Sequence, residues 1–189
     1  MFLRSTNKYA VITFLFLVTG CFDFVQAQSI YQTVSGNISF SSEAPLELIR
    51  ASSDQLIGLL DNDKKTFSFK INIRSFQGFN SPLQREHFNE NYMESDKFPQ
   101  ASFSGKIIEE VDLGKDGEYE VRAKGLLTIH GVAQERIIKT NVSVKNKKIT
   151  ITGKFSVLLS DHNIPIPIVV YKKLANEIKV EVNTILEPR

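Results

Sequence analysis

The segment TFSFKINIRSF, residues 66–76, alternates apolar and polar side chains from one residue to the next. Its apolar members are Phe67, Phe69, Ile71 and Ile73, and they share one side of an extended chain. A period of two predicts a β-strand with one buried face and one face in water. Such strands are typical of antiparallel sheets that cover a single interior.

The same alternation recurs along the chain. It is clear in residues 118–129, 148–159 and 177–185, and shorter candidate strands are Gly36–Ser42, Gln55–Asp61, Ala101–Ile108 and Ile137–Val144. Polar turns at residues 61–65, 114–117 and 145–148 separate several of them. About eight long strands with one polar face each predict an all-β domain, an extended antiparallel barrel or a sandwich. A closed barrel would also leave no exposed sheet edge.

Residues 81–99 interrupt the β pattern. Ser81 can cap a helix, Pro82 suits its first position, and Gln84 completes a capping box. Pro99 ends any helix before the next strand. The sequence therefore predicts one short helix over residues 82–94. Its apolar groups lie on two sides, so we expect it to pack as a lid across a barrel mouth.

The bulk composition excludes several classes of function. The chain has 189 residues, a formal net charge of +2, three His and one Cys. This charge balance predicts no nucleic-acid partner. The few His and Cys residues predict no metal site and no internal disulfide. The sequence predicts one domain and no cofactor.

The first 27 residues have the layout of a secretory signal peptide. Arg4 and Lys8 precede the apolar run AVITFLFLVTG, and small residues surround Ala27. We expect cleavage after Ala27, a mature domain of residues 28–189, and a periplasmic or secreted location. In the alternative, Val18–Cys21 acts as a bacterial lipobox, and a lipid on Cys21 attaches the protein to a membrane.

Candidate catalytic groups are few. His87 could pair with Glu86 or Glu90, but a surface or helix-side histidine is the preferred interpretation. His130 and His162 have no partner at metal-ligand spacing. The chain has no nucleophile elbow, phosphate loop or dinucleotide fingerprint. We therefore do not expect an enzyme.

Two blocks resemble the YceI-like family. FNENYMESDKFPQASFSGKI, residues 88–107, is similar to the family segment in which a phenylalanine-rich helix leads into a strand, and GLLTIHGVAQERIIK, residues 125–139, is similar to its strand–turn–strand. The resemblance implies a lipocalin-like barrel closed by a short helix. It also implies that an isoprenoid or other long lipid binds in the lumen. The front of the domain, residues 35–61, diverges from the family pattern.

Carried over to this sequence, the motif makes Phe88, Phe98 and Phe103 the first candidates for ligand-binding residues, followed by Tyr92 and Met93. Arg74 and Arg85 are candidates for a head-group contact, or are simply solvated charges. The resemblance predicts a lipid-sequestering protein. The alternative is an envelope scaffold with a solid barrel, because a phenylalanine-rich interior can be either packed core or cavity wall.

Overall fold

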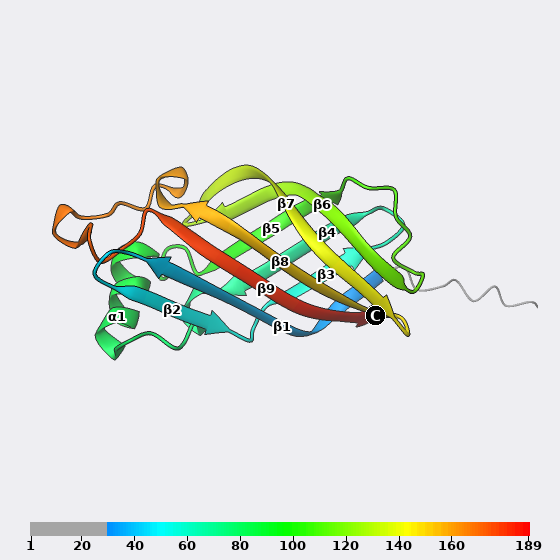
Figure 1. Ribbon diagram of the computed structural model, residues 1–189, viewed down its shortest axis with the longest axis horizontal. Coiled ribbons are helices and arrows are strands. Elements are labelled where there is room, and N and C mark those ends of the chain that lie inside the picture. The colour runs from blue at the N-terminus through cyan, green and yellow to red at the C-terminus, as the bar shows by residue number, and fades with distance from the viewer. Residues whose placement is uncertain (1–29) are drawn as a thin grey trace, which may run out of the picture.

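The computed structural model describes residues 30–189 and contains nine β-strands (Figure 1). They are β1 (Ile30–Glu43), β2 (Leu48–Ser53), β3 (Ile57–Asp61), β4 (Thr66–Asn72), β5 (Gln100–Ile107), β6 (Gly117–Ile129), β7 (Val132–Lys145), β8 (Lys148–Leu158) and β9 (Glu177–Pro188). All neighbouring strands pair in antiparallel fashion. The predicted signal peptide and Cys21 lie outside the described residues.

The sheet closes into a barrel through β1 and β9, which pair from Tyr31 opposite Pro188 to Ser41 opposite Lys179. Strands β2 and β3 pair with two different parts of the same edge of β1, so they are two halves of one barrel strand. The prediction of an antiparallel barrel of about eight strands is thus confirmed. Strand β2 was not predicted, and β7 begins five residues before the expected Ile137.

The predicted helix is also present. It begins as α1 (Pro82–His87) and continues as a π-helical turn, η2 (Phe88–Tyr92). The Ser81 side chain accepts a hydrogen bond from the N–H of Gln84, as a capping residue should. The Gln84 side chain accepts from the N–H of Asn80, one residue earlier than in a standard capping box.

One end of the barrel is closed by packed side chains. Leu60, Phe67, Leu113, Ile149 and Leu186 belong to one buried cluster there, and the last two and Leu113 are completely buried. Leu113 lies in the connection between β5 and β6, where its N–H donates to the side chain of Asn62. This loop is the floor of the barrel.

The other end carries the helical segments. Besides α1 and η2, these are the 3-10 turns η1 (Ile73–Ser75), η3 (Leu159–His162) and η4 (Ile168–Val170). In Figure 1 they gather at the end opposite the C-terminus, with the η4 loop projecting beyond the strands. We call this end the mouth.

The barrel wall has a discontinuity near the mouth. The β7–β8 ladder ends at Thr140 opposite Gly153, although β7 and β8 both continue toward the mouth. Beyond that point β7 contacts η3 instead. Gln134 donates a hydrogen bond to the carbonyl of Asp161 (2.7 Å), and Arg136 forms an ion pair with the Asp161 carboxylate (3.5 Å). Polar contacts therefore replace the β ladder there.

Candidate functional site

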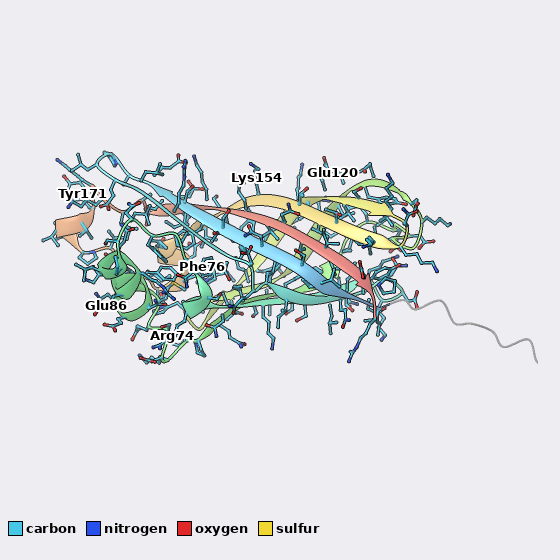
Figure 2. All side chains as sticks on the ribbon, turned by 90° about the horizontal axis from the view of Figure 1, so that it is seen from below. Arg74, Phe76, Glu86, Glu120, Lys154 and Tyr171 are labelled. Carbon is cyan, nitrogen blue, oxygen red and sulfur yellow. The ribbon has the colours of Figure 1, made fainter. Side chains whose placement is uncertain are left out.

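A cavity of about 590 Å³ occupies the barrel and extends from the mouth toward the floor. Its size is within the usual range of ligand pockets. Side chains from all the barrel strands line it, and most are apolar. Figure 2 labels Phe76 inside the barrel outline, whereas Lys154 and Glu120 point outward from it. For Lys154 and Glu120 the alternation along the strand produces this direction, whereas Phe76 directly follows η1.

Several inward-facing residues are only half-buried, although they point into the interior. They are Ile38, Phe40, Phe69, Phe103, Ile151, Phe155, Ile178 and Val182. A solid core would bury such side chains almost completely. Their remaining exposed surface faces the cavity, so the barrel is hollow along much of its length.

Four phenylalanine rings form the wall near the mouth. Phe40 stacks on Phe88 with 5.4 Å between ring centroids, and Phe79 lies 5.0 Å from Phe88. Phe76 completes the group, 5.3 Å from Phe40. Phe88 comes from η2 and Phe40 from β1, so the helical segment is attached to the barrel by aromatic packing.

A second aromatic group lies deeper. Phe103 of β5 pairs with Phe69 of β4, and its ring lies 4.9 Å from that of Phe67, which is 6.2 Å from Phe69. All three line the cavity. Phenylalanine adds apolar surface without a polar group that would need a partner. The interior can therefore hold an apolar chain but offers it few hydrogen bonds.

Four of the five predicted ligand-binding residues line this cavity: Phe88, Tyr92, Met93 and Phe103. Burial raises the pKa of the Tyr92 hydroxyl above its ordinary value, so this side chain stays neutral. That these four residues bind a ligand stays a prediction.

Phe98, the fifth, is not part of the cavity wall. Its ring packs edge-on against His130 with 4.6 Å between centroids. It also covers Gly131, where a Cβ atom would lie 2.5 Å from Cε1 of Phe98. The two sequence blocks that resemble the YceI-like family therefore contact each other here, and Phe98 holds the β6–β7 turn against the segment after η2.

Sequence reasoning missed much of the wall. Phe40, Phe69, Phe76 and Phe155 line the cavity but lie outside the blocks that drew attention to Phe88 and Phe103. For Phe40, Phe69 and Phe155, alternation with polar neighbours was the signal that could have identified them, because it fixes the inward face of each strand. Phe76 follows η1 and lies outside the strands.

Polar groups lie mainly at the mouth, where Glu47, Gln84, His87 and Lys173 are part of the wall. The Gln84 amide donates to the Glu47 carboxylate over 2.8 Å, which joins α1 to the β1–β2 turn. His87 and Lys173 are exposed side chains at this rim. A ligand with an apolar chain and a polar or anionic head group would meet these side chains as it enters.

Arg74 and Arg85 do not line this cavity. Arg74 donates to Ser95 and forms an ion pair with Asp96, and Arg85 donates to the carbonyl of Arg74. Both border a separate hollow of about 570 Å³ on the outer side of α1. They hold the segments around α1 together, whereas His87 and Lys173 do line the cavity at the mouth.

The other two histidines have structural partners. His130 Nε2 lies 2.7 Å from a Glu94 carboxylate oxygen, and its Nδ1 lies 3.2 Å from the carbonyl oxygen of His162. The fully buried His162 donates from Nδ1 to the carbonyl of Val132. The hydrogen bond from His130 lowers the pKa of Glu94 below its ordinary value, with a further contribution from Lys97. This network joins the end of η2 to the β6–β7 turn and η3.

Within residues 30–189, no three His, Cys, Asp or Glu side chains come together as metal ligands. The helices in this part of the chain are too short or too polar to cross a membrane.

The fold is similar to several solved structures. A polyisoprenoid-binding domain from Saccharophagus degradans aligns with a TM-score of 0.69 at 13% identity, covering 86% of this chain and 100% of that one. BcnA from Burkholderia cenocepacia aligns with a TM-score of 0.66 at 16% identity, covering 79% and 95% of the two chains. At these identities the likeness concerns the fold alone.

A third structure, the YceI protein of Campylobacter jejuni, aligns with a TM-score of 0.57 at 15% identity, covering 71% of this chain and 82% of the other. The sequence has no match among curated proteins. The family model of the YceI-like domain, however, matches residues 18–186, which include every strand and helix that surrounds the cavity except the last two residues of β9. With this match the earlier resemblance is confirmed, and the chain belongs to the YceI-like family.

Proposed function

We propose that this protein binds a long apolar lipid, isoprenoid-like in character, and carries it in the barrel lumen. The observation that carries the proposal is the cavity of about 590 Å³, which is lined by phenylalanine and aliphatic side chains and closed at the Leu113 end. Moving hydrocarbon from water into such a space is favourable by about 0.8 kcal/mol per buried CH₂ group. Sequestration needs no catalytic group.

Two further points support this choice of ligand. The residues that line the cavity extend from Leu83 at the mouth to Leu113 at the floor, which suits an extended chain better than a compact ligand. The Saccharophagus degradans domain with the same fold is described as binding polyisoprenoid. The head group would stay at the mouth near His87 and Lys173.

We further propose that the protein acts in the periplasm or as a secreted protein, because residues 1–27 read as a signal peptide. The lipobox alternative at Cys21 would instead hold it on a membrane. Mass spectrometry of the intact mature protein from its native host distinguishes these outcomes, because cleavage after Ala27 and lipidation of Cys21 give different masses.

Native mass spectrometry of the protein purified from a bacterial host tests lipid binding. We expect a stoichiometric hydrophobic passenger that solvent extraction releases. A clean ligand-free mass that stays unchanged after incubation with prenyl lipids would contradict the proposal and favour the solid scaffold.

Replacing both Phe88 and Phe103 by Asp in one variant should abolish binding of a prenyl probe, because each substitution places a carboxylate on the apolar wall. A matched control replaces Leu126 and Ile137 by Asp, since both are exposed hydrophobic residues on the barrel. The control variant should bind the probe as the wild type does. Equal binding by a folded Phe88→Asp, Phe103→Asp variant would remove these residues from the site.

A further inference from the structure

Large apolar side chains are exposed at the mouth. Ile168 is 85% exposed, Val169 is 89% exposed and Tyr171 is 59% exposed. Leu46 in the β1–β2 turn and Leu83 in α1 are 67% and 57% exposed. Exposed apolar side chains that are gathered at one place commonly mark an interaction surface. We call four exposed residues of the loop that contains η4 the tip: Ile168, Val169, Tyr171 and Lys172.

The tip adjoins the mouth directly. The N–H of Leu46 donates to the carbonyl of Lys172 over 2.9 Å, which brings the β1–β2 turn against the η4 loop. Val170, Lys173 and Leu174 of the same loop line the cavity, and so does Leu83. Figure 2 shows Tyr171 at the extreme of the molecule, at the same end as Glu86 of α1.

The chain holds the tip in this position. Buried Ile164 anchors the segment before it, and Ile166 and Leu174 pack against the same cluster. Within the loop, the N–H groups of Lys173 and Leu174 both donate to the carbonyl of Val170, over 2.7 and 3.0 Å. The loop thus buries its flanking apolar residues and points Ile168 and Val169 away from the protein. Their exposure follows from an ordered local structure.

The charge of the loop indicates the chemistry of its partner. Residues 163–176 contain Lys172 and Lys173 and no acidic residue. The Lys172 ammonium lies 5.6 Å from the centroid of the Tyr171 ring. Apolar side chains beside a tyrosine and lysines suit the interface of a bilayer. The apolar side chains would enter the hydrocarbon, the tyrosine would lie among the head groups, and the lysines would contact the anionic charge.

We propose that the tip inserts into the surface of a bilayer containing anionic lipids and so places the mouth against the membrane. This inference rests on the proposed function, because a lipid that moves from a membrane into the cavity needs a path that shields its chain from water. The exposed apolar side chains of the tip lie beside Val170 and Leu174, which line the cavity, and so offer apolar surface along that path. A protein partner would not explain why the patch continues into a lipid-sized cavity.

Vesicle co-sedimentation tests the proposal, with one series of phosphatidylcholine vesicles and another of equal parts phosphatidylcholine and phosphatidylglycerol. We expect the wild-type protein to bind the anionic vesicles more strongly, and added salt to weaken that binding. In the Ile168→Thr, Val169→Thr variant we expect binding to fall by about tenfold, because two side chains lose apolar surface while keeping their β-branched shape.

A matched variant, Ile57→Thr with Leu59→Thr, removes two exposed apolar side chains from β3. It should bind vesicles as the wild type does. Lys172→Gln should reduce binding to the anionic vesicles only. Neither Ile168, Val169 nor Lys172 lines the cavity, so each tip variant should still bind a prenyl probe in solution.

The two proposals can fail separately. If the wild type binds the probe but no vesicles, or if the tip variant binds vesicles as well as the wild type, the membrane proposal is wrong and the proposed function stands. If the tip mediates self-association, detected by sedimentation velocity and lost in the tip variant without any vesicle binding, the patch is a protein contact and the membrane proposal is again wrong. Absence of probe binding by the wild type would contradict the proposed function itself, whatever the vesicles show.

Discussion

The ring of Phe69 lies over the backbone of Gly58, its direct partner across β3 and β4. A Cβ atom on Gly58 would overlap the ring and lie 2.5 Å from Cε1 of Phe69. Since Phe69 lines the cavity, the absence of a side chain at position 58 leaves the ring room to lie flat against the wall. The width of the lumen at this level therefore depends on a residue that does not line it.

Gly58→Ala should push the Phe69 ring into the lumen and weaken binding of a long prenyl probe by about three- to tenfold, equivalent to roughly 1 kcal/mol. Titration of the probe by fluorescence measures the change. In a Phe69→Ala background the same substitution should have almost no effect, because the ring that it displaces is gone. An equal loss of affinity in both backgrounds would show that Gly58 acts by another route.

Two alanines on the wall allow the depth of binding to be measured. Ala101 lies near the mouth, and Ala123 pairs with Ile107 at the other end of β5. Six residues of strand separate the two levels, a distance of about 20 Å. We expect Ala101→Leu to weaken binding of short and long prenyl alcohols alike. Ala123→Leu should affect only those long enough to reach the floor.

Both leucine variants overfill part of the barrel, so each should cost about 1–3 kcal/mol of stability. Since both variants lose stability, a difference in binding between them reflects the position of the added side chain. If Ala101→Leu and Ala123→Leu weaken binding of short and of long prenyl alcohols by the same factors, the ligand does not extend along the barrel axis.

Leu113→Ala should destabilise the barrel by about 2–5 kcal/mol, because the completely buried side chain would leave a void in the floor. Denaturant unfolding measures this loss. The same substitution adds space at the closed end, so the folded variant should accept chains longer than the wild type does. A variant with full stability would mean that the loop between β5 and β6 repacks and that Leu113 does not close the floor of the barrel.

Glu94→Gln should lower the thermal stability at pH 7, and the difference from the wild type should disappear in acid. The pKa of Glu94 is lowered in the folded state, chiefly by the hydrogen bond from His130. A group with a lowered pKa stabilises the fold above its ordinary pKa of about 4.3, and this contribution is lost as the pH falls through the folded-state value. Melting temperatures of both proteins between neutral pH and pH 3 would reveal the convergence.

Glu120→Gln serves as the control for that experiment. Glu120 is an exposed carboxylate on β6 and points away from the barrel in Figure 2. Its substitution should change stability little at any pH. A gap between wild type and Glu94→Gln that persists at low pH would mean that the loss arises from packing and not from the ionised carboxylate.

The alternation of side chains predicted the barrel because most strands keep one apolar face along their length. It failed at β2, whose inward residues are Ile49, Ala51 and Ser53, two of them small or polar.

The alternation also missed the start of β1, where a register shift between Thr33 and Ser35 breaks the period of two. The first part of β7 was missed because the half-buried positions 134 and 136 hold Gln and Arg and not apolar residues. These two side chains contact Asp161 where the ladder to β8 has ended.

The candidate site was predicted only in part, because the motif covers one segment of the cavity wall. The motif identified residues near the helix, and four of them line the cavity. It included Phe98 because a sequence cannot tell a ring that faces a lumen from one that covers the glycine of a neighbouring turn. It omitted Phe40 because that residue comes from the divergent front of the domain and meets Phe88 only after the barrel has closed.

The pairing of β1 with β9 also sets the order of assembly. Thr184 donates a hydrogen bond to the carbonyl of Ser35, a residue 149 positions earlier in the chain. A chain that emerges residue by residue, from a ribosome or through a membrane, can form the local hairpins but cannot close the cylinder until β9 has appeared. Contacts between residues so far apart in sequence slow folding, and until they form β1 has an unprotected edge. The interval before closure is therefore when this protein is most exposed to aggregation.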